Sequence, residues 1–153
     1  MIRKTSDSQR GFSMIEVLIA IVVLAIGLLG FALLQTTNLR YTQSANNRTL
    51  ATNLAYSLLD QMRTNRLSAA QYTTAGFAAD SLTAAACIPP TATDAVAQGI
   101  ATWRCQVFNS LGPSTQATVA YNASGVATVT LRWGERSAVA TENATEFIAR
   151  TQL

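Results

Sequence analysis

The longest apolar run in the chain lies near its N-terminus. Val17–Leu34 holds eighteen residues without a charge. With Phe12–Glu16 in front of it, the run makes about 23 helical positions, or roughly 35 Å at 1.5 Å per residue. That length is enough to cross a hydrocarbon core of about 30 Å. The sequence therefore predicts one membrane-spanning helix.

Basic residues lie before this run and not directly after it. Arg3, Lys4 and Arg10 precede it, against the single acidic residue Asp7, and the next basic residue is Arg40. Positively charged flanks of a membrane helix stay on the cytoplasmic side. We therefore expect a single pass, with the N-terminus in the cytoplasm and the rest of the chain outside.

A secretory signal peptide is the alternative interpretation of this segment. Its apolar region runs about 7–15 residues and ends in a small-residue cleavage site. The run here is longer, and Gln35–Asn38, which follows it, contains no such site. The pattern favours a retained helix.

Glu16 is the one charge near the start of the predicted helix. A carboxylate at the middle of a membrane costs about 2.5–3.5 kcal/mol on insertion scales, and less near the surface. Two explanations are open from this residue alone. The side chain reaches the lipid headgroups, or it meets a positive group of another subunit.

The segment Gly11–Leu18, which reads GFSMIEVL, resembles the processing signature of type IV pilins and the related pseudopilins. In that family a basic leader ends in glycine, a phenylalanine follows, and a glutamate lies four residues beyond it. The resemblance implies that prepilin peptidase cuts between Gly11 and Phe12 and methylates the new amino group of Phe12. It also implies that Glu16 neutralises the N-terminal amine of an adjacent subunit in a filament.

Four segments are expected along the chain. These are a leader peptide at 1–11, a transmembrane or filament-core helix at 12–34, an amphipathic continuation of the helix at 35–66, and a globular domain at 67–153.

The continuation of the helix is indicated by apolar residues at every fourth position. No Gly or Pro occurs between Phe31 and Ala75, so nothing in the sequence breaks the helix before about Arg66. We expect the apolar stripe to face the core of the globular domain. The stripe consists of Leu50, Leu54, Leu58 and Met62.

Two stretches of the predicted helix resemble PilV-type minor pilins. They are AIGLLG at Ala25–Gly30 and LLDQMRTNR at Leu58–Arg66. The resemblance implies a subunit that helps to prime assembly at or near the pilus tip. Its partners would be prepilin peptidase, the other minor pilins, the major pilin and the inner-membrane assembly platform. The location implied is the bacterial inner membrane, with the C-terminal domain in the periplasm, and later the extracellular pilus.

Beyond Arg66 the pattern predicts an α+β domain. A connection rich in Ala, Thr and Ser is expected at Leu67–Thr93, with room for a short helix at 81–86. Asp94 is expected to cap a helix that ends near Phe108. Alternating residues then predict three strands, at 116–121, 126–133 and 146–152, of which the first two form a hairpin.

The fold class that follows is α+β. The resemblance implies the type IV pilin fold, in which a long N-terminal helix packs on a small antiparallel sheet with an extra short helix.

Cys87 and Cys105 are the only cysteines, and the expected topology places both outside the cytoplasm. An oxidising compartment favours a disulfide between them. A closed loop of about 18 residues would contribute about 3 kcal/mol in the chain-entropy model. Two unrelated free thiols are the alternative. A metal site is not expected, because the chain has two cysteines and no histidine.

The charge and the missing histidine limit the classes of function. The net charge of +3 comes largely from the leader, because outside it eight Arg face seven acidic residues. That near-neutral balance argues against a nucleic-acid-binding surface. Without histidine, nucleophiles activated by His are excluded, so we expect neither an enzyme nor a cofactor. The alternatives are a type II secretion pseudopilin, a DNA-binding pilin, and an adhesive module in which Leu67–Thr93 carries recognition.

Overall fold

The computed structural model of the protein describes residues 11–87, 94–134 and 144–153. They fall into two units, of which the first ends at Tyr41 and the second begins at Thr42. Apart from Gly11, the predicted leader lies outside the described residues.

One long helix, α1 (Met14–Thr64), contributes residues to both units. It ends two residues before the predicted end at Arg66. The side chains of Thr64 and Asn65 both donate to the carbonyl oxygen of Gln61, at 2.9 and 3.2 Å. The backbone N–H of Asn65 donates to the same carbonyl at 3.1 Å, so three donors converge on it at the end of the helix.

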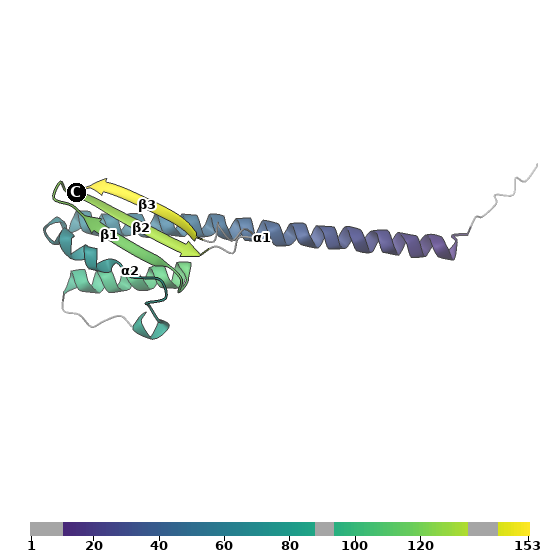
Figure 1. Cartoon of the computed structure of the whole chain (residues 1–153), viewed down its shortest axis with the longest axis horizontal. Helices are drawn as coiled ribbons and strands as arrows, with labels where there is room; N and C mark the ends of the chain where they lie inside the picture. Colours follow the sequence, from purple (N-terminus) through teal and green to yellow (C-terminus); the bar gives the residue numbers. More distant parts are fainter. Residues whose placement is uncertain (1–10, 88–93, 135–143) are drawn as a thin grey trace, which may run out of the picture. The chain divides into compact units, whose positions relative to one another are not determined.

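The sheet of the second unit has three antiparallel strands in the order β1 (Gln116–Tyr121), β2 (Val126–Gly134) and β3 (Ala144–Gln152). Figure 1 shows the strands side by side, with the last part of α1 behind them. The three predicted strands and the antiparallel α+β fold are confirmed. The hairpin between β1 and β2 contains Gly125, whose φ of 79° suits glycine.

A second helix, α2 (Ala95–Leu111), begins where predicted. The carboxylate of Asp94 accepts the backbone N–H of Val96 at 3.1 Å, which is an N-cap. The helix ends three residues after the predicted Phe108. Gly112, with a φ of 94°, stops it and donates its N–H to the Phe108 carbonyl at 3.0 Å.

The core of the second unit lies between α1, α2 and one face of the sheet. The indole Nε1–H of Trp103, which is fully buried, donates to the carbonyl oxygen of Leu54 at 2.8 Å and joins α2 to α1. The buried residues of α1 repeat at helical spacing, as the predicted stripe requires. They are Ala51, Leu54, Ala55, Leu58, Leu59 and Met62.

The segment after α1 is more ordered than the sequence led us to expect. We predicted a connection at Leu67–Thr93, but the chain forms the 3₁₀-helix η1 (Arg66–Ala75), and the prediction was wrong there. Its buried side chains are three residues apart, because a 3₁₀-helix has three residues per turn. They are Ala69, Tyr72 and Ala75. Beyond η1, Phe77 pairs with Ala117 of β1.

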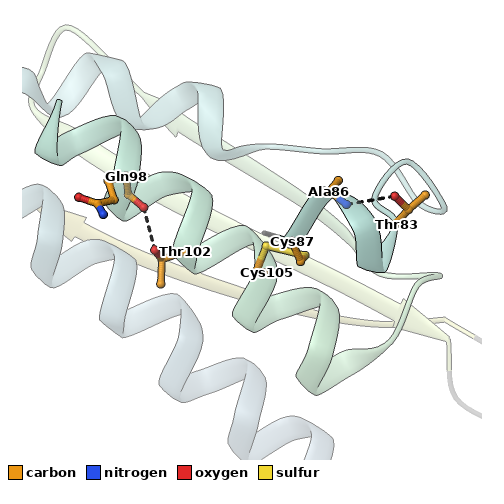
Figure 2. Close-up of a disulfide and its surroundings, with 6 residues drawn as sticks. All are labelled: Thr83, Ala86, Cys87, Gln98, Thr102 and Cys105. Carbon is orange, nitrogen blue, oxygen red and sulfur yellow. Dashed lines mark hydrogen bonds between the residues drawn. A yellow bond between two sulfur atoms is a disulfide. The ribbon is translucent and has the colours of Figure 1, made fainter. Parts of the chain in front are cut away.

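A disulfide joins Cys87, at the end of a short 3₁₀-helix η2 (Ala84–Cys87), to Cys105 of α2 (Figure 2). The two Cα atoms are 5.2 Å apart. Next to it, Ala86 donates its N–H to Oγ1 of Thr83 at 3.3 Å. The structure thus pairs the two cysteines, and the short helix predicted at 81–86 is found one turn later.

The double variant Cys87→Ser/Cys105→Ser tests the contribution of this disulfide. We expect the free energy of unfolding of the second unit to fall by about 3 kcal/mol, because the unfolded chain regains the freedom of a closed loop of about 18 residues. Urea unfolding of the full chain in detergent, followed by Trp fluorescence, measures it. Wild-type protein treated with reductant should match the variant. Equal midpoints for the oxidised wild type and the variant would contradict this.

Candidate functional site

The described segment before α1 has no regular secondary structure and is exposed. Gly11, Phe12 and Ser13 lie outside the helix, and the Phe12 side chain is 85% exposed. Proteolytic cleavage concentrates at exposed segments outside regular structure. The peptide bond between Gly11 and Phe12 is therefore accessible in the chain by itself.

Gly11 has no structural reason to be glycine within this chain. A Cβ atom built on it would meet nothing within 4 Å, and its φ is not in the left-handed region. A requirement for glycine at this position must therefore come from outside the described chain. An enzyme that binds the backbone closely is one such requirement.

Ser13 provides the start of α1. Its carbonyl oxygen accepts the N–H of Glu16 at 3.0 Å and that of Val17 at 3.4 Å. The helix thus begins two residues after the predicted Phe12. The spacing Ser-x-x-Glu from Ser13 to Glu16 is the pattern of a capping box. Ser13 was not among the predicted site residues, although this spacing marks it as a candidate for the helix start.

Glu16 lies in the first turn of α1, and its residue is exposed. A negative charge there interacts favourably with the helix dipole, by about 0.3–1 kcal/mol. Among the described residues, salt bridges join only Arg63 to Asp60 and Arg132 to Glu146. No described cation therefore pairs with Glu16, so the described part of the chain leaves this carboxylate available.

The apolar side chains that follow Glu16 are uncovered. An 18-residue window of α1 has a mean hydropathy of 3.1, and none of it is buried in the structure. By length and composition, α1 contains one segment that can cross a membrane. An apolar surface of this size is unfavourable in water and marks a membrane or protein contact. The large residues are half or more exposed throughout, from Val17 to Leu34.

Gly27 and Gly30 lie within this uncovered part of α1. A Cβ atom on either would meet nothing within 4 Å, so neither glycine is needed for packing inside this chain. Small residues let two helices in a membrane approach closely. The pair therefore suits contact with a helix of another molecule.

The remaining predicted site residues, Cys87 and Cys105, belong to the second unit. They form the disulfide between η2 and α2. They take no part in the N-terminal segment, which comprises Gly11, Phe12, Ser13 and Glu16 and is the candidate functional site.

Comparison with known proteins bears on this same segment. Residues 6–32 match the family model described as the prokaryotic N-terminal methylation motif. No curated protein and no solved structure matches the chain.

The motif is typical of type IV pilins and pseudopilins, which are structural proteins, and it implies processing by prepilin peptidase. Its match includes the exposed Gly11, Ser13 in front of α1, and Glu16, which has no ion-pair partner among the described residues. The described second unit has the matching architecture, with the end of the long N-terminal helix packed on a three-stranded antiparallel sheet. The chain therefore carries the prepilin-type methylation motif of type IV pilins and pseudopilins at the start of a pilin-like α+β fold.

Proposed function

We propose that the protein is a minor pilin of a type IV pilus, of the PilV type, that helps to prime assembly at or near the pilus tip. Prepilin peptidase removes the leader 1–11 and methylates the new amino group of Phe12. Segment 12–34 then serves as membrane anchor and filament core, 35–66 continues the helix, and 67–153 is the periplasmic domain.

The observation that carries this proposal is an uncovered apolar helix with one carboxylate in its first turn. A plain anchor needs only the apolar side chains. An assembly subunit needs a device that selects the register in which helices pack. A charge in an apolar contact is such a device, because a misaligned helix leaves it unpaired.

A comparison of two free energies favours a partner for Glu16 over a purely local role in the helix. The helix dipole stabilises the carboxylate by about 0.3–1 kcal/mol. Burial of an unpaired carboxylate in an apolar environment costs about 2.5–3.5 kcal/mol or more. Capping alone therefore does not offset burial among packed helices. The amino group that cleavage creates on Phe12 of a neighbouring subunit supplies the missing positive charge.

The partners that this function requires are prepilin peptidase, the other minor pilins, the major pilin and the inner-membrane assembly platform. The protein is first an inner-membrane protein and then enters the extracellular filament. A type II secretion pseudopilin is the second candidate, because the matched motif is typical of both classes. Recovery from sheared pili, against recovery only with a secretion complex, distinguishes them.

The mature N-terminus tests the processing step. We expect mass spectrometry of the protein from its native cells to find a chain that starts at Phe12 and carries one methyl group on its amine. The variant Gly11→Val, which adds a branched side chain at the proposed cleavage site, should keep its leader. Functional wild-type protein that retains Met1–Gly11 would refute the proposal.

The variant Glu16→Gln tests the assembly step, since it keeps the size of the side chain and removes the charge. We expect normal insertion and cleavage, but at least about ten-fold less protein in sheared pili. Removing one member of a buried charge pair costs about 2–5 kcal/mol. Quantitative immunoblots of the membrane and pilus fractions provide the measurement.

Asp80→Asn is the matched control, because it removes an exposed carboxylate of the second unit. It should enter pili as the wild type does. If Glu16→Gln is recovered equally well, Glu16 has only a local role in the helix.

A further inference from the structure

β3 is an edge strand, and its outer edge has no partner among the described residues. Leu153 donates its N–H to Gly125 at 2.9 Å, which extends the ladder between β2 and β3. Backbone bonding alternates along an antiparallel pair, so the odd-numbered residues of β3 bond to β2. The N–H and C=O groups of the even-numbered residues point to the free edge. These residues are Ala144, Glu146, Ile148, Arg150 and Gln152.

The opposite edge of the sheet, formed by β1, is partly paired within the chain. Phe77 and Ala117 of β1 exchange two backbone hydrogen bonds, at 2.9 and 3.0 Å. Part of the β1 edge is therefore covered by the chain itself. Within the described ranges, no segment does the same for β3. An uncovered strand edge is a template for pairing with another chain.

The side chains along the β3 edge decide which partner strand it can accept. Ala149 is buried, whereas Ile148 is 48% exposed on the outer face of the sheet. Glu146 and Arg150 flank Ile148 on that face. Glu146 has a nearby cation, since Arg132 lies 3.5 Å from its carboxylate. No described carboxylate forms a salt bridge with Arg150.

The order Glu146, Ile148, Arg150 is its own complement. If a second β3 runs antiparallel with Ile148 facing Ile148, each Glu146 faces Arg150 of the other copy. All three residues direct their backbone groups outward, so the same register also satisfies the ladder hydrogen bonds. Opposite charges across strands stabilise a pair, and like charges destabilise it.

We propose that the free edge of β3 binds β3 of a second copy of this chain, antiparallel and centred on Ile148. The two sheets then form one continuous six-stranded sheet. The centre of the contact is apolar and its rim is charged, as in specific protein interfaces. One strand edge buries less than a standard interface of about 1,600 Å², so we expect a reversible dimer.

This symmetry decides where the contact can act. A two-fold axis gives a closed pair in which the two strands run in opposite directions. Subunits of one filament are related by a helical repeat and all point the same way. The contact therefore joins copies carried by two different assemblies, which goes beyond the proposed role of the N-terminal segment.

Charge reversal tests the register. In Arg150→Glu, each Glu146 faces another carboxylate, and both pairs of the dimer are lost at once. We expect the dissociation constant of the purified full chain in detergent to rise about ten-fold or more. The triple variant Arg132→Glu/Glu146→Arg/Arg150→Glu restores both pairs with exchanged signs, keeps opposite charges at positions 132 and 146, and should dimerise as the wild type does. Arg66→Glu, which makes the same charge change on an exposed residue outside the edge, is the control.

The measurement must detect pairing through the β3 edge and must not respond to association through the apolar helix. Hydrogen exchange at the amides of Ile148 and Arg150 does so, because both point to the free edge. We expect their exchange to slow as the protein concentration rises, and to lose that dependence in Arg150→Glu. Ile148→Pro should also lose it, because proline removes an outward N–H that β2 does not use. Thermal unfolding confirms that each variant is folded.

Exchange at Ile148 that is independent of concentration in the wild type would overturn the proposal, and the two charges would then only keep strand edges apart. A triple variant that dimerises as weakly as Arg150→Glu would also overturn it, because self-pairing requires that exchanged charges restore the contact. Neither result affects the proposed processing at Phe12 or the role of Glu16, which are measured in native cells on other residues.

Discussion

The apolar face of α1 between Ala51 and Met62 is part of one core with η1, α2 and the three strands. Ala51 and Ala55 have no exposed surface, and their small side chains let neighbouring elements approach the helix closely. Trp103 then anchors α2 to this face, and the carbonyl of Leu54 satisfies its buried N–H. Gly99 shows how close the two helices are, because a Cβ atom there would lie 2.9 Å from Oε1 of Gln61.

The same helix is built for two environments. Its first part is apolar all round and buries nothing within the chain, whereas its second part has one apolar and one polar face. A helix that is apolar on all sides belongs in lipid or inside a larger assembly. Glu16 is the exception in the first part, and this is why the proposed function depends on it. The second part obtains its stability from its own domain and needs no partner for that purpose.

Much of the fold could be predicted because apolar residues recur at regular spacings that are typical of helices and strands. The four-residue repeat of α1, the cap at Asp94 and the two-residue alternation of Val129 and Leu131 are local signals, and the structure agrees with each. η1 was missed because small residues such as Ala69 and Ala75 carry little hydrophobic signal, and three-residue spacing is rarely sustained. Its burial depends on tertiary contacts that no local window contains.

The residues of the candidate site also differ in how far local sequence patterns could predict them. Gly11, Phe12 and Glu16 could be predicted because they fill the positions of a short processing signature directly before a long apolar run. Ser13 is equally local but was overlooked, since its contribution is a backbone carbonyl and not a side chain. The free edge of β3 could not be foreseen, because the alternation of a strand does not tell whether a neighbour lies on both sides.

The position of β3 in the chain has a consequence for biogenesis. β3 is C-terminal to every other described element, yet its odd-numbered residues complete the ladder of β2, and Phe147 packs against the core. If the N-terminus stays in the cytoplasm, as proposed, and the rest of the chain crosses the membrane in sequence order, this strand arrives last. Until then, β2 is itself an edge and the core is open on one side. Under the proposed topology, the domain then completes its folding only after these residues have crossed the membrane, and until that point a chaperone could bind the open edge of β2.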